Sequence, residues 1–188
     1  MAKWTSEGAG NSTGMTQRIY RYVGPEEIRN RVTAEPDRTC IKSREDLKAW
    51  VAKAEPNTRR RDYVPATFVV DISNQIWLAD RRSEHVACAA GAGVLAAGEL
   101  VISESGKSVE VIEATNQSTG YCPEPACWSA VSAALDEAAI PHPARFTTAF
   151  EFRRCDGCGS TNLIKDDVFE CSVCGGELSR EWNYQRTD

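Results

Sequence analysis

The strongest constraint on the fold of this chain is a cysteine pattern near its carboxyl end. The pattern C-x-x-C-G occurs there twice, with 12 residues between the two cysteine pairs. Two cysteines three positions apart can direct both sulfurs at one ion, and the glycine that follows lets the backbone turn back toward them. Four thiolates arranged as a tetrahedron suit a single Zn²⁺ ion. The predicted ligands are Cys155, Cys158, Cys171 and Cys174.

Two short apolar runs lie between the cysteine pairs, at residues 163–165 and 168–170, and they can pair as a hairpin around Asp166 and Asp167. Together with the cysteines, this segment resembles the zinc ribbon family over residues 153–178. Four cysteine ligands leave no open position on the ion, so we expect a structural rather than a catalytic zinc. An iron-binding or redox use of the same cysteines is the minor alternative.

The eight cysteines also bear on the compartment. A chain of 188 residues can bury a hydrophobic core without disulfides, so the cysteines need another reason. Their metal-ligand spacing favours a reducing compartment, and the first 16 residues lack the cationic start and apolar stretch of a secretory signal. No run approaches the roughly 18 consecutive apolar residues that cross a bilayer. We therefore expect a cytoplasmic protein with no membrane association.

Charge is distributed unevenly along the chain. Residues 1–82 contain 15 basic and 11 acidic side chains, whereas residues 83–188 contain 7 and 16. A phosphate-binding surface would lie in the first half, around Arg59, Arg60 and Arg61 or around Arg81 and Arg82. A solvated loop is the simpler interpretation of the three-arginine run. Residues 153–182 contain four basic and six acidic side chains, and this net negative charge argues against nucleic-acid binding by the ribbon. A nucleic-acid adaptor is therefore the least favoured hypothesis.

The apolar periodicity predicts an α+β fold, with an antiparallel sheet, two or three helices and a C-terminal zinc ribbon. We expect a disordered tail over residues 1–16, an α+β domain over 17–152 and the ribbon over 153–182. A short strand and helix are predicted over residues 19–28, and longer helices over 44–54 and 125–139. The remaining predicted strands cover residues 67–72, 75–79, 94–103, 109–114 and 146–152.

Two polar loops, residues 80–93 and 116–125, connect the predicted strands and helix. Loops carried by a sheet commonly hold functional residues, and these two meet if their flanking strands are neighbours. Our leading hypothesis is a zinc-stabilised intracellular binding module that recognises a protein or a small polar ligand through both loops. The candidate ligand-binding residues are Asn116, Ser118 and Tyr121.

The alternative hypothesis is a small transferase or hydrolase. His85 would favour the thiolate of Cys88 or Cys122 as a nucleophile. Either Glu99 or Glu84 would supply a carboxylate. A second zinc ion shared by His85, Cys88, Cys122 and Cys127 is a further alternative. The simplest interpretation is purely structural, because lone buried cysteines commonly behave as small hydrophobic residues.

A second resemblance covers residues 67–140. It rests on His85, Ala90-Gly91, the run 94–100, Asn116-Gln117-Ser118 and Tyr121-x-Pro123. In this order, the residues resemble a module of plant IQ-motif calmodulin-binding proteins and of assorted bacterial proteins. That module has Gly-His before its tyrosine, whereas this chain has Thr119-Gly120, so the role of that histidine is not transferred. The chain contains no IQ motif, so the resemblance implies a shared α+β scaffold and not calmodulin binding.

Overall fold

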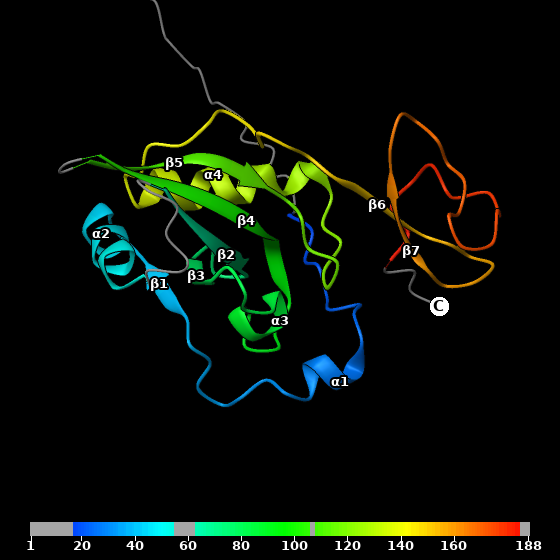
Figure 1. Ribbon diagram of the computed structural model, residues 1–188, viewed down its shortest axis with the longest axis horizontal. Coiled ribbons are helices and arrows are strands. Elements are labelled where there is room, and N and C mark those ends of the chain that lie inside the picture. The colour runs from blue at the N-terminus through cyan, green and yellow to red at the C-terminus, as the bar shows by residue number, and fades with distance from the viewer. Residues whose placement is uncertain (1–16, 55–62, 106–107, 185–188) are drawn as a thin grey trace, which may run out of the picture.

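A computed structural model describes residues 17–54, 63–105 and 108–184 of the chain (Figure 1). It confirms the α+β class: a five-stranded antiparallel sheet in the order β1-β3-β2-β4-β5 is followed by a two-stranded sheet, β6-β7. The predicted tail over residues 1–16 and the arginine run at 59–61 lie outside the described residues. The helices and strands, in chain order, are α1 (Glu26–Arg29), β1 (Thr39–Ile41), α2 (Arg44–Lys53), β2 (Tyr63–Asp71), β3 (Ile76–Asp80), α3 (His85–Cys88), β4 (Val94–Ser105), β5 (Ser108–Thr115), the 3₁₀ turn η1 (Pro125–Cys127), α4 (Trp128–Glu137), β6 (Glu151–Arg154) and β7 (Thr161–Ile164).

Helix α2 begins where the sequence predicts. The Ser43 hydroxyl accepts a hydrogen bond from the backbone N–H of Asp46 at 3.1 Å, which satisfies one of the free donors in the first turn. Leu47 and Val51 lie on the buried side of the helix. The second predicted helix is also confirmed, as η1 followed directly by α4.

One face of the large sheet is covered by α2 and α4. Leu47 of α2 and Leu135 of α4 lie beside Leu78, Leu100 and Val111 from three strands, and all five side chains are buried. The strand pairs β2-β3 and β4-β5 that build this face are the two predicted hairpins. Apolar burial on this scale is the main source of stability for the fold.

The opposite face, which we call the open face, is covered only in part. Trp77 alternates with Leu78 along β3, so its side chain points to the open face. The Arg38 guanidinium lies 4.0 Å from the centre of the Trp77 ring and donates a hydrogen bond to the Cys88 carbonyl at 2.8 Å. The short helix α3 therefore covers the open face where it crosses β2 and β3.

The outer edge of β5 is occupied by the chain that follows α4. The N–H of Val111 donates to the carbonyl of Pro141 at 2.9 Å, and the N–H of Thr147 donates to the carbonyl of Ala114 at 2.9 Å. The Thr147 hydroxyl accepts from the N–H of Ala114. The opposite edge strand, β1, has three residues and was not predicted from the sequence.

The structure differs from the sequence prediction in three extended segments. Residues 146–150 form an isolated bridge to β5 at Thr148 rather than a strand, and the strand begins at Glu151. Strand β7 pairs with β6, so residues 163–165 do not pair with 168–170 beyond one bridge. The predicted strand near residue 20 is likewise a single bridge to Val94. The bridges of Tyr20 to Val94 and of Thr148 to Thr115 join segments that are distant along the chain.

Candidate metal centre and binding loops

The four predicted ligands converge on one point. Their Sγ atoms all lie within 4.8 Å of one another, and the pairs Cys155–Cys174 and Cys158–Cys171 are each 3.6 Å apart. A tetrahedral ion with Zn–S bonds of about 2.3 Å separates its sulfurs by about 3.8 Å. A disulfide requires about 2.05 Å, so these sulfurs are not bonded to each other. The group can hold one metal ion, and its donor set fits zinc.

Each cysteine pair is shaped by its glycine. Gly159 and Gly175 have φ angles of +75° and +71°, a left-handed conformation that residues with a side chain adopt at a cost. In the same turns, the Gly159 N–H donates to the Cys155 carbonyl at 2.8 Å, and the Gly175 N–H donates to the Cys171 carbonyl at 2.9 Å. The two turns are equivalent, as the repeated C-x-x-C-G pattern predicts. With the β6-β7 hairpin beside them, they make a site like that of a zinc ribbon.

Two polar residues that sequence reasoning missed also contact the sulfurs. The Ser160 hydroxyl oxygen lies 3.0 Å from the Sγ of Cys158 and 3.3 Å from that of Cys171. Its hydrogen bond lowers the pKa of Cys158, and it is the largest cause that lowers the pKa of Cys171 to about 5. The Asn162 amide nitrogen lies 3.6 Å from the Cys171 Sγ. These donors favour the thiolate form, which is the form that binds a metal.

The segment after the second cysteine pair joins the metal centre to the large sheet. The Trp182 indole N–H donates to the carbonyl of Cys122 at 2.7 Å, and its ring meets the Tyr20 ring edge-on at 5.5 Å. The Asn183 amide exchanges two hydrogen bonds with the backbone of Arg154, at 2.8 and 2.7 Å. Trp182 therefore folds back onto its own chain and packs against residues outside the metal centre.

The two predicted loops meet in the structure. The Tyr121 hydroxyl in loop 116–125 donates to the carbonyl of Ala92 in loop 80–93 at 2.7 Å. Tyr121, Asn116 and Ser118 are all buried. The Asn116 amide donates to the carbonyls of Pro123 and Phe150 and accepts from the Phe150 N–H. The use of these three residues in ligand binding stays a prediction, and the structure gives two of them internal partners.

The candidate catalytic residues lie in separate environments. The His85 Nε2 is 3.0 Å from the carbonyl of Gly98, so Nε2 carries the hydrogen, and burial lowers the pKa of this imidazole. The Cys88 thiol donates to the carbonyl of Trp77, and burial raises its pKa to about 12. The Cys122 thiol donates to the carbonyl of Thr119, and burial raises its pKa to about 11. In the described chain, no hydrogen bond joins His85 to either thiol.

The described residues do not form the second metal site. Among the residues that the structure describes, the four-cysteine group is the only cluster of three or more potential metal ligands. His85, Cys88, Cys122 and Cys127 do not converge, because Cys122 packs with Phe152 and Tyr184 in a separate apolar cluster. The predicted catalytic carboxylate, Glu99, is half-buried on the open face, next to Gly98 in β4.

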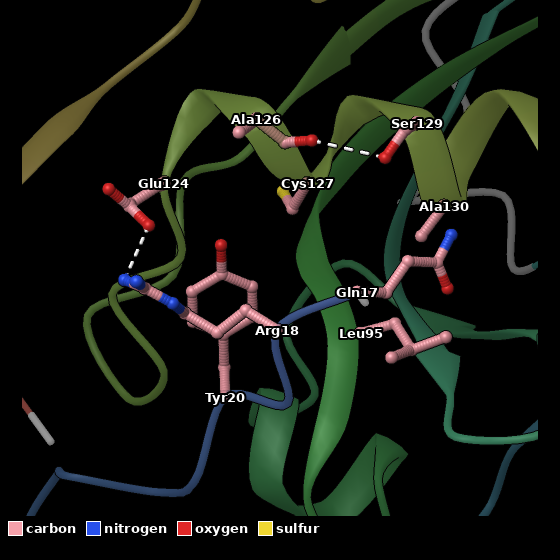
Figure 2. A pocket seen from close by; sticks show the side chains of 9 residues that line it. All are labelled: Gln17, Arg18, Tyr20, Leu95, Glu124, Ala126, Cys127, Ser129 and Ala130. Atoms are coloured by element: carbon pink, nitrogen blue, oxygen red, sulfur yellow. Dashed lines mark hydrogen bonds and ion pairs between the residues drawn. The ribbon is translucent and has the colours of Figure 1, made fainter. Parts of the chain in front are cut away.

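Each loop borders a cavity. Figure 2 shows the cavity beside loop 116–125, which we call the Glu124 pocket; it has a volume of about 240 Å³. Arg18 and Glu124 form an ion pair of 2.6 Å on one side, and Cys127, Tyr20 and Leu95 line the interior. Beside loop 80–93 lies a larger groove of about 430 Å³ on the open face, which we call the Arg81 groove.

None of the helices in the described part of the chain is long and apolar enough to cross a membrane. Comparison of the chain with known protein families, with curated proteins and with solved structures finds no match. The resemblance of residues 67–140 to the plant and bacterial module therefore stays a prediction. The structure shows a group of four cysteines like that of a zinc ribbon, attached to an α+β fold.

Proposed function

We propose that this protein is an intracellular, zinc-stabilised binding module that recognises a protein or a small polar ligand through loops 80–93 and 116–125. The single observation that carries the structural half of this proposal is the convergence of four sulfurs within 4.8 Å. With four thiolate ligands the coordination of zinc is complete, so the ion would hold the fold and would not activate a substrate.

The recognition half of the proposal is supported by the two cavities. The Tyr121–Ala92 hydrogen bond ties the loops together, and each loop contributes a charged side chain to a cavity, Arg81 to the groove and Glu124 to the pocket. Both sites combine apolar lining with a few polar groups, the composition typical of ligand sites.

The enzyme alternative finds less support in the geometry. A nucleophilic cysteine needs a low thiol pKa and a nearby base, but burial raises the pKa of Cys88 and of Cys122. Both thiols are more than nine-tenths buried within the fold and donate to backbone carbonyls. We therefore place the transferase or hydrolase function second.

The test combines metal analysis with ligand mapping on the full chain. We expect one zinc per chain, and we expect polar metabolites or a partner protein to shift backbone amide NMR signals within the two loops. A chain without zinc, or ligand-induced shifts confined to other surfaces, would contradict the proposal. Rapid labelling of Cys88 or Cys122 by a thiol reagent, with zinc retained, would favour the enzyme alternative instead.

A further inference from the structure

The Arg81 groove has a structural origin that sequence reasoning did not anticipate. Between Val101 and Ile102 the pairing of β4 with β5 shifts, because Val101 faces Glu113 whereas Ile102 faces Val111. Ile112 is therefore an extra residue in β5, and this bulge turns both Ile112 and Glu113 toward the groove. Helix α3 lies mainly over β2 and β3, and within the described chain the surface beside the bulge is hollowed into this groove.

The floor of the groove is apolar. Pro65 in β2 pairs with Val101 in β4, and Val101 pairs in turn with Glu113, so one row of side chains crosses three strands. Ile112 lies beside this row, and Tyr63, which is 45% exposed, forms a wall. An exposed tyrosine over aliphatic side chains is typical of binding surfaces.

The charged groups of the groove are predominantly acidic. Glu99 and Glu113 lie on neighbouring strands and are offset by two positions, which places their side chains roughly 7–8 Å apart. Neither carboxylate has a hydrogen-bond or ion-pair partner among the described residues. Arg81 supplies one positive charge at the end of the groove nearest loop 80–93. Two free carboxylates above an apolar floor complement a ligand with a cationic head and an aliphatic body.

We propose that the Arg81 groove binds an extended peptide segment in which one Lys or Arg side chain is flanked by aliphatic side chains. The groove spans β2, β4 and β5, a width of about 10 Å, which matches about three residues of extended chain. The basic side chain lies between Glu99 and Glu113, the aliphatic ones contact Pro65 and Val101, and Arg81 disfavours a second cation at its end. This inference rests on the proposed function, because Arg81 belongs to one of the two recognition loops.

The test selects peptides from a random library of short sequences on the immobilised, zinc-loaded full chain. We expect the enriched sequences to share one Lys or Arg with aliphatic neighbours. The best sequence is then synthesised with a fluorescent label, and its binding is measured by anisotropy. Chemical-shift mapping should place it at Tyr63, Val101 and Ile112.

The decisive variant is Glu99→Gln combined with Glu113→Gln, which preserves the shape of both side chains and removes their negative charges. We expect it to weaken peptide binding on the order of 5- to 30-fold and to abolish most of its salt dependence. The matched control, Glu137→Gln combined with Glu181→Gln, removes the same charge from exposed positions outside the groove and should bind as the unchanged chain does.

Three results of the selection and binding measurements would overturn the inference. They are enrichment of sequences without a basic residue, absence of any enrichment, and equal binding by the Glu99/Glu113 variant. Peptide-induced shifts confined to the Glu124 pocket would also overturn it, yet that result would support the proposed function, since loop 116–125 borders that pocket. The two proposals therefore fail on different observations.

Discussion

Replacement of one metal ligand, Cys171→Ala, should unfold the metal centre and leave the large sheet folded. The buried apolar cluster around the centre contains only Cys155, Cys171 and Leu178, with Ile164 and Phe169 partly buried against it. Full burial of a leucine contributes about 1.5–3 kcal/mol, which is small compared with the conformational entropy of ordering more than twenty residues. The bound ion must therefore supply most of the free energy that keeps this segment folded. Structural zinc sites supply about 10–16 kcal/mol.

The size of the expected effect follows from this imbalance. Removal of the ion should lower the free energy of opening residues 155–178 by at least about 4 kcal/mol. This corresponds to a thousandfold change in the opening equilibrium. The large sheet should keep its stability, because the cluster that contains Phe68, Leu100 and Leu135 is separate from the cluster that contains the metal ligands. The perturbation is therefore expected to be local.

Amide hydrogen exchange measures this directly. The informative amides are those of Cys155, which donates to Ser160, and Leu178, which donates to Phe169. Both should lose protection in Cys171→Ala and in the chelator-treated chain, whereas amides of β2 and β4 should not. Cys40→Ala is the matched control, because this half-exposed cysteine lies outside the cluster. Retained protection at Leu178 in a metal-free sample, or loss of protection in β2, would refute the reasoning.

Three further predictions concern the large sheet. In Gly98→Ala, the new Cβ would lie 1.9 Å from the carbonyl oxygen of Thr115, a backbone atom that cannot move alone, so thermal unfolding should show a loss of about 3 kcal/mol or more. Asn116→Ala removes the partners of two carbonyls and one N–H, and urea unfolding should show a loss of about 2–4 kcal/mol. Because burial lowers the pKa of His85, the unfolded chain binds a proton at mildly acidic pH that the folded chain does not. The free energy of unfolding should therefore fall as the pH drops below about 6.5. In urea titrations, His85→Gln should flatten this dependence on pH.

Local patterns in the sequence predicted the elements that depend on local interactions. Runs of β-branched and aromatic residues around a turn located the β2-β3 hairpin, and alternation of apolar and acidic residues located the β4-β5 hairpin. Ser43 located the start of α2, and the repeated C-x-x-C-G pattern located the metal ligands. Each of these signals lies within the element that it predicts, so a single sequence is sufficient to read it.

The features that the sequence did not reveal depend on contacts between distant segments. Aromatic residues predicted a strand over 146–152, but the Phe150 N–H is held by the side chain of Asn116 instead of a strand partner. The docking of Trp182 on the carbonyl of Cys122 joins residues 60 positions apart. The Arg81 groove requires the bulge opposite Val101, and no local residue preference identifies the extra residue in β5.

The chain segment along β5 restricts how other molecules can approach this protein. Exposed strand edges recruit strands from other chains, which leads to aggregation or to strand addition. Here the Val111–Pro141 and Ala114–Thr147 hydrogen bonds occupy donors and acceptors that a foreign strand would need, and the opposite edge offers only the three residues of β1. Among the described residues, both edges of the sheet therefore offer little room for an added strand, whereas the Arg81 groove over β2, β4 and β5 remains open.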